Sequence, residues 1–232
     1  MAKKSSSPTL TAYGEWQFAY DYFNKELFDG ELPDCIITLN AENPKVFGYF
    51  HGGQYAHLEG EIKDELSMNP KHFFGRPLFA VLATLAHEMC HVWQFHYGEK
   101  KSLRTYHNQE WGDKMESIGL MPSLTGQPEG KKTGQSMSHY IIEGDIFEVT
   151  CKTLIEEDNF KISWSNRESL ITLDDDMLEP EGKDEKEPKK KKQTRAKFTC
   201  SGCQANVWGK PSLNIICADC NIKFETEDGE DL

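Results

Sequence analysis

One segment, residues 77–97, constrains the fold of this chain more than any other. It is almost wholly apolar, has no internal glycine or proline, starts with a proline suited to the first helical position and stops at Gly98. These features predict one long buried helix. Within it, His87, Glu88 and His91 form the pattern H-E-x-x-H. Polar side chains are costly in an apolar helix unless something satisfies them, so the pattern marks a candidate site.

The H-E-x-x-H pattern is typical of a catalytic zinc site. Residues four apart lie on one face of a helix, so His87 and His91 can direct ring nitrogens at one metal ion. Glu88 can then reach a metal-bound water, whose pKa falls toward neutrality, and take its proton as the hydroxide attacks a carbonyl. The alternative is a pair of buried histidines hydrogen-bonded to the backbone, with Glu88 paired elsewhere.

A third metal ligand has to come from the chain beyond this helix. His96 is five residues after His91, about 140° further round the helix, so it points away from the metal face. His107 heads the next predicted helix and is the better candidate, with Glu110 and Glu116 as alternatives. Surface or structural roles are expected for the remaining histidines, His51, His57, His72 and His139.

The rest of the chain before residue 170 alternates between helical and strand-like patterns, which predicts an α+β fold. Helices are expected at 10–29, 77–97 and 107–118, and strands at 35–39, 46–50, 55–66, 140–151 and 160–163. A turn at Gly52-Gly53 would join the second and third strands. We therefore expect helices packed on a small antiparallel sheet.

Four of the seven cysteines form a compact C-x2-C-x13-C-x2-C pattern near the C-terminal end: Cys200, Cys203, Cys217 and Cys220. Each pair can aim two thiolates at one point, and two facing pairs complete the sulfur tetrahedron that suits a structural zinc ion. Disulfides are the alternative. Three widely separated further cysteines, and a start that lacks the apolar core of a signal peptide, favour a reducing compartment.

Residues 174–197 contain almost no large apolar side chain, which predicts a mobile linker. The linker begins acidic and ends with the basic residues Lys189, Lys190, Lys191, Lys192, Arg195 and Lys197. A formal charge of −12 argues against a protein that coats nucleic acid with its whole surface, but it permits one local basic site. This basic stretch, with Phe198 and Trp208 stacking on bases, would favour single-stranded or distorted DNA. The alternative is a solvated linker beside a structural ribbon.

Three segments together resemble the SprT-like (Spartan-like) zinc metalloprotease family of the bacterial type. They are Leu-Ala-His-Glu-Met-Cys-His at 85–91, Tyr-His-Asn-Gln-Glu-Trp at 106–111, and the four-cysteine ribbon with Val-Trp-Gly-Lys-Pro at 207–211. The family often has glycine where this chain has Tyr106, and no strongly basic surface is visible in the sequence.

The resemblance implies a zincin-like metalloprotease domain at 10–170, a charged linker at 171–197, a zinc ribbon at 198–224 and an acidic tail at 225–232. It implies His87, His91 and His107 as ligands of a catalytic zinc, and Glu88 as the general base. A second, structural zinc would be held by the four cysteines. The implied substrates are proteins associated with DNA, including those crosslinked to it.

Three functions are therefore open at this point: a zinc endopeptidase acting on DNA-associated proteins, a non-catalytic adaptor or regulator that works through its ribbon, and a metallohydrolase of small substrates. The intact His-Glu-His set favours the first. No segment approaches the roughly 18 apolar residues of a membrane helix, so no membrane partner is expected. A cytoplasmic location is expected, with nucleoid association if the source is bacterial.

Overall fold

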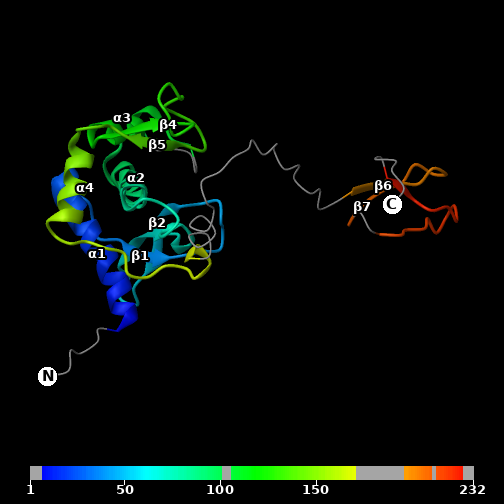
Figure 1. Cartoon of the computed structure of the whole chain (residues 1–232), viewed down its shortest axis with the longest axis horizontal. Helices are drawn as coiled ribbons and strands as arrows, with labels where there is room; N and C mark the ends of the chain where they lie inside the picture. The colour runs from blue at the N-terminus through cyan, green and yellow to red at the C-terminus, as the bar shows by residue number, and fades with distance from the viewer. Residues whose placement is uncertain (1–6, 101–105, 171–195, 211–212, 227–232) are drawn as a thin grey trace, which may run out of the picture. The chain divides into compact units, whose positions relative to one another are not determined.

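The computed structural model describes residues 7–100, 106–170, 196–210 and 213–226. The chain divides into two compact units, residues 1–179 and 180–232 (Figure 1). Each unit has a hydrophobic core of its own. Most of the predicted linker, 171–195, lies outside the described residues. Among the helices that the structure describes, none is long and apolar enough to cross a membrane.

The predicted helices of the first unit are confirmed, with ends shifted by a few residues. They are α1 (Pro8–Leu27), α2 (Leu78–Tyr97) and α3 (Gln109–Ser117). The helix α2 contacts α1, α3 and α4 (Ile146–Glu156) as well as the strands β2 and β3, and Figure 1 shows it in the middle of the unit. This central position explains why its sequence is apolar all round.

The main sheet contains β1 (Ile36–Leu39), β2 (Gly48–Ala56) and β3 (Ile62–Met68) in the order β1-β3-β2. The prediction of a purely antiparallel sheet is wrong, because β1 runs parallel to β3 and only β2 runs antiparallel to it. A short 3₁₀ helix, η1 (Pro70–His72), follows the sheet.

The predicted turn at Gly52-Gly53 is also wrong, because β2 continues through both glycines with a shift of register between His51 and Tyr55. Gly53 adopts φ +64°, and its N–H donates to Asp64 Oδ1 at 2.7 Å. The glycines therefore form a bulge that a carboxylate of the neighbouring strand stabilises. The chain reverses further on, where the N–H of Gly60 donates to the carbonyl of His57.

The region predicted as one strand at 140–151 contains the end of β5 (Ser138–Ile141) and the start of α4. The strand β5 pairs antiparallel with β4 (Leu120–Ser123). Asp145 caps α4, and the buried Phe147, Cys151 and Leu154 have helical spacing. The predicted strand 160–163 is absent from the described structure.

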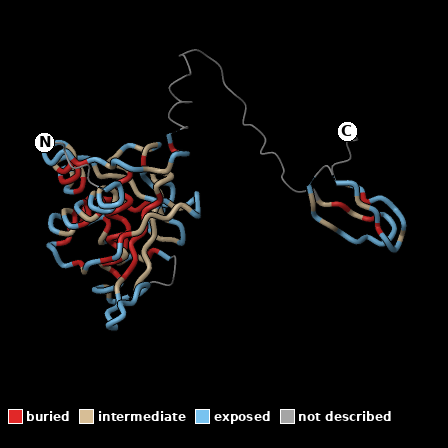
Figure 2. The backbone as a smooth tube through the Cα atoms, turned by 90° about the horizontal axis from the view of Figure 1, so that it is seen from below, coloured by how far each residue is buried: buried red, intermediate tan, exposed pale blue. Residues whose placement is uncertain are grey.

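The core of the first unit lies between the helices and the sheet, where the buried residues concentrate (Figure 2). The ring of Phe23 from α1 packs against that of Phe147 from α4, with centroids 5.7 Å apart.

The second unit is a small antiparallel sheet of β6 (Ala196–Thr199), β7 (Asn206–Gly209) and β8 (Glu225–Thr226) in the order β7-β6-β8. The first two residues of the predicted acidic tail thus form β8. Among the described residues of this unit, the buried core consists of Phe198, Phe224, Cys200 and Cys217. A core of this size needs a further source of stability, such as a metal ion.

Candidate metal centres

Three histidines meet inside the first unit. One ligand nitrogen from each of His87, His91 and His107 lies within 4.8 Å of the others. We call these residues the histidine cluster. The Nε2 atoms of His91 and His107 are 3.0 Å apart, close to the roughly 3.4 Å expected between nitrogens on a tetrahedral zinc ion with bonds of about 2.0–2.1 Å. The donor set and its spacing fit zinc.

His107 reaches the cluster because its backbone is fixed between α2 and α3. It forms an isolated β-bridge with Gly134. The backbone N of His107 lies 2.7 Å from the carbonyl oxygen of Gly134, to which it donates, and the N of Gly134 donates to the carbonyl oxygen of His107 at 3.1 Å. The next residue, Asn108, caps α3 by accepting from the N–H of Trp111, and it also accepts from Gln94 of α2. The cap therefore joins the two helices directly beside His107.

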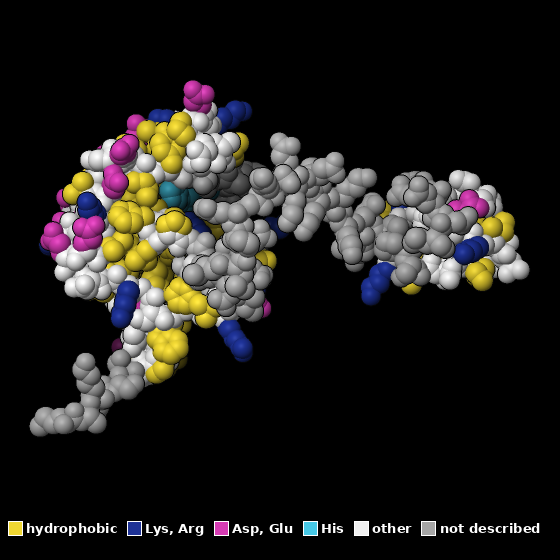
Figure 3. Space-filling view, viewed as in Figure 1, with side chains coloured by type: hydrophobic (Ala, Val, Ile, Leu, Met, Phe, Trp, Pro, Cys, Tyr) yellow, Lys and Arg dark blue, Asp and Glu magenta, His cyan; other side chains and the backbone are white. Residues whose placement is uncertain are grey.

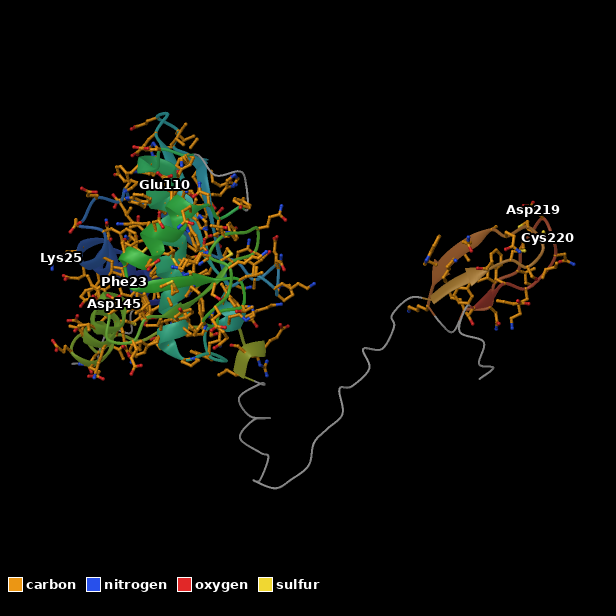
Figure 4. The ribbon with its side chains drawn as sticks, turned by 90° about the horizontal axis from the view of Figure 1, so that it is seen from above. Phe23, Lys25, Glu110, Asp145, Asp219 and Cys220 are labelled. Atoms are coloured by element: carbon orange, nitrogen blue, oxygen red, sulfur yellow. The ribbon has the colours of Figure 1, made fainter. Side chains whose placement is uncertain are left out.

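The alternative third ligands are engaged elsewhere. Glu110, labelled in Figure 4, accepts hydrogen bonds from the backbone N–H groups of Glu99 and Lys100. Glu116 forms an ion pair with Lys132 at 2.8 Å. His96 contacts Asp64 at 2.5 Å. Neither carboxylate belongs to the cluster, and His96 points away from it as expected.

Burial keeps the three histidines neutral near pH 7. It lowers the pKa of His91 to about 3, with His107 as a further cause, and it lowers the pKa of His87 well below the ordinary value, with the neighbouring rings adding to the effect. The pKa of His107 is lowered in the same way. Neutral imidazole is the form that binds a metal ion.

Glu88 lies beside the cluster with 6% of its surface exposed, and burial raises the pKa of its carboxyl to about 8. It faces the start of β2 closely: a Cβ added at Gly48 would lie 3.2 Å from Glu88 Cγ. A divalent cation at the cluster would favour the ionised carboxylate. The carboxyl group of Glu88 is therefore suited both to take up and to release a proton.

Two residues near the cluster were not assigned to the site from the sequence. Trp111 is fully buried, its ring centroid lies 4.4 to 5.2 Å from those of the three histidines, and its Nε1 has no hydrogen-bond partner in the described part of the chain. His139 of β5 places Nδ1 3.2 Å from Nδ1 of His87. The expected surface or structural role for His139 takes the structural form, because this histidine lies against the candidate metal ligand His87. No local pattern in the sequence signals that contact.

The four cysteines of the second unit also converge, with their sulfur atoms within 4.8 Å of one another. The Sγ atoms of Cys203 and Cys217 are 3.7 Å apart, and a tetrahedral zinc ion with bonds of about 2.3 Å separates its sulfurs by roughly 3.8 Å. Hydrogen bonds from the backbone, that of Cys203 first, lower the pKa of the Cys200 thiol to about 7. The set fits a structural zinc ion.

Both Cys-x-x-Cys segments form the same kind of turn. The N–H of Gln204 donates to the carbonyl of Cys200 at 2.9 Å, and the N–H of Asn221 donates to that of Cys217 at 2.8 Å. Gln204 and Asn221 adopt φ +62° and +54°. Figure 4 marks Cys220 in the second of these turns. Two equivalent turns thus present the four sulfurs.

The residues predicted to contact DNA are only partly described. Lys189, Lys190, Lys191, Lys192 and Arg195 lie outside the described residues. Lys197 of β6 pairs with Trp208 of β7, whose side chain is 66% exposed. Trp208 is therefore not a core residue. Phe198 is 3% exposed, so the expectation that it stacks on bases is wrong.

The fold and these two clusters define an α+β protein with two candidate metal centres. The SprT-like family model matches residues 17–133, half of the chain, and the match includes the whole histidine cluster. The chain therefore belongs to the SprT-like family.

Among curated proteins, the chain is similar to an uncharacterized protein in the mucB 3′ region of Salmonella typhimurium. The two are 52% identical over 42 residues, which are 18% of this chain and 55% of that protein. The chain thus spans about half the length of this relative. No solved structure matches.

Proposed function

We propose that this chain is a zinc-dependent endopeptidase with a zincin-like fold, which cleaves DNA-associated or DNA-crosslinked proteins. The observation that carries the proposal is the meeting of His87, His91 and His107 beside the buried Glu88. Membership of the SprT-like family supports the same conclusion, because that family is associated with metallopeptidase activity.

The three histidines would hold the zinc ion, which supplies a polarised water and stabilises charge on the carbonyl oxygen. Glu88 would act as the general base toward that water. Burial favours the protonated form of this carboxyl, so the same group is suited to return the proton to the leaving amine. The side chains around the cluster hold the ligands in place.

Two of the histidines have hydrogen-bond partners that suit a metal ligand. Nδ1 of His107 lies 3.2 Å from the carbonyl oxygen of Gly134, and Nδ1 of His87 faces Nδ1 of His139 at 3.2 Å. If Nε2 of each ring binds the metal, Nδ1 carries the proton and donates it to these acceptors. His139 and Gly134 thus orient two of the three ligands.

The position of β2 supports a polypeptide as substrate. In the three-stranded sheet β2 is an edge strand, and its first residue, Gly48, packs against Glu88. An edge strand can bind an extended peptide through main-chain hydrogen bonds. A small-molecule hydrolase has no need of such an edge beside its general base.

DNA would be contacted by the second unit and the basic stretch before it. The exposed Trp208 beside Lys197 supports base stacking next to a positive charge. The proposed location is cytoplasmic and associated with the nucleoid.

The test is cleavage of a DNA-binding protein, with and without single-stranded DNA, by the wild type and by Glu88→Gln. We expect DNA-stimulated cleavage that the substitution abolishes while two zinc ions stay bound. Absence of cleavage by the zinc-loaded wild type would contradict the proposal. It would favour the second candidate function, an adaptor that works through its ribbon, which the exposed Trp208 also supports. For such an adaptor, Cys200→Ser would abolish DNA or protein binding, and Glu88→Gln would not.

A further inference from the structure

Arg76 carries a positive charge beside α2 that forms no ion pair with a carboxylate of the described residues. Its Nη2 donates to the carbonyl oxygen of Ala80 at 2.8 Å, and Nη1 and Nη2 both lie 3.2 Å from Thr84 Oγ1. Its Cζ lies 4.1 Å from the ring centroid of Phe47. None of the ion pairs within the described residues includes Arg76. Its hydrogen-bond acceptors within the part of the chain that the structure describes are therefore neutral.

Such an arrangement is costly without a further ligand. The side chain of Arg76 is half-buried, and burial lowers the pKa of its guanidinium. A partly buried charge is usually paired with an opposite charge. A guanidinium has five N–H groups, and the three hydrogen bonds above leave two of them with no acceptor in the chain as described. The group can therefore still bind an anion.

The guanidinium contacts Thr84, which lies one helical turn before the proposed general base on the side of α2 that faces β2. Thr84 precedes Glu88 by four residues, and a Cβ added at Gly48 would lie 3.2 Å from a carbon of each. The two side chains thus share the face of α2 that packs on the start of β2. One turn of a helix advances about 5.4 Å.

The guanidinium also lies beside the start of β2, because its Cζ packs on the ring of Phe47, the residue before that strand. It therefore lies beside both α2 and the start of β2, which adjoin the candidate catalytic centre.

We propose that Arg76 binds the carboxylate of an aspartate or glutamate side chain of the substrate, within two residues of the bond that is cut. This inference rests on the proposed endopeptidase function. A peptide along the edge of β2 would advance about 3.3 Å per residue, so one helical turn corresponds to one or two residues. The planar fork of a guanidinium matches a carboxylate in geometry as well as in charge.

The test is digestion of a proteome-derived peptide library, with the cut sites identified by mass spectrometry. We compare the wild type with Arg76→Gln, with Arg76→Lys, and with Arg167→Gln, which removes the same charge from an exposed position. In the wild type and in Arg167→Gln we expect Asp and Glu to be enriched at one position within two residues of the cut. The enrichment should disappear in Arg76→Gln and persist more weakly in Arg76→Lys.

A binding measurement on Glu88→Gln gives a readout that does not depend on turnover. A fluorescent peptide copied from the strongest cut site should bind about tenfold more tightly than its Glu→Gln counterpart. Adding Arg76→Gln should bring this ratio close to one.

The possible failures are distinguishable. A wild type that cuts no peptide contradicts the endopeptidase proposal and this inference with it. Cutting without an acidic preference, or with a preference that survives in Arg76→Gln, overturns the inference alone. Weaker binding of single-stranded DNA by Arg76→Gln, with the peptide preference intact, would show that the guanidinium contacts phosphate and also overturns it.

Discussion

Each histidine of the cluster is held by a group that the H-E-x-x-H pattern does not contain. The carbonyl oxygen of Gly134 accepts a hydrogen bond from Nδ1 of His107, and Nδ1 of His139 lies against Nδ1 of His87. The ring of His91 stacks on that of Trp111 with an interplanar angle of 19°. Such partners fix the orientation and the tautomer of metal-binding histidines. Substitutions that remove these partners should therefore weaken metal binding while the chain still folds.

We expect His139→Ala to weaken zinc binding by about tenfold to a hundredfold, because His87 loses the acceptor that orients it. His139→Asn offers an amide oxygen near the position of Nδ1 and should restore most of the affinity. Competition with a chromogenic chelator measures both. The control is Tyr140→Phe, the next residue along β5, whose side chain faces the opposite side of the strand. Unchanged zinc affinity in His139→Ala would refute the assigned role.

At the scale of elements, the close packing of β2 on α2 positions Glu88, the proposed general base. A Cβ at Gly48 would lie 3.0 Å from the carbonyl oxygen of Ser67 and 3.2 Å from Glu88 Cγ. The backbone oxygen belongs to β3 and cannot move without disturbing the sheet. Glu88 or the strand must therefore shift if this glycine is replaced.

Gly48→Ala should lower the cleavage rate by about tenfold to a hundredfold while zinc stays bound, because the general base is displaced from its position. Steady-state kinetics and zinc content, measured on the same sample, check this. The matched control is Gly14→Ala in α1, where a Cβ meets nothing within 4 Å. That substitution should leave the rate unchanged and stabilise the fold by about 0.5–1 kcal/mol. Equal rates for Gly48→Ala and the wild type would argue against the packing constraint.

The elements that sequence patterns predicted well are those fixed by local periodicity. The helices α1, α2 and α3 are of this kind, as is the convergence of His87 and His91 on one face of α2. The sheet was predicted less well, because the parallel pairing of β1 with β3 and the bulge at Gly53 depend on distant residues such as Asp64. The β-branched residues of α4 favoured a strand, but the cap at Asp145 and core packing produced a helix.

The same limit applies to the site. His107 was identified because it heads a helix, whereas His139 lies against His87 only through a contact between distant elements, and Arg76 reaches Thr84 from the segment that precedes α2. Neither residue lies at a spacing from the H-E-x-x-H motif that a sequence pattern could detect.

At the scale of the whole molecule, the chain has two units with different sources of stability. The first has an extensive apolar core, whereas the described residues of the second include four buried core residues, two of which are cysteines of the candidate zinc site. Metal binding and folding are expected to be coupled in the second unit.

We therefore expect Cys203→Ser to unfold the second unit and to leave the thermal unfolding of the first unchanged. Two-dimensional NMR resolves the two, because signals of the second unit should collapse to unfolded positions while those of the first persist. Ser201→Ala, an exposed change inside the same turn, is the control. A second unit that stays folded without its metal would show that its small apolar core is sufficient.

The central claim is that the histidine cluster holds a zinc ion on which cleavage depends. Native mass spectrometry of the wild type and of His107→Ala, on the samples assayed for cleavage, tests it most directly. The account predicts two zinc ions per chain in the wild type, one in His107→Ala, and no cleavage by the variant. Two zinc ions in His107→Ala, or undiminished cleavage by a chain that has lost one, would contradict it.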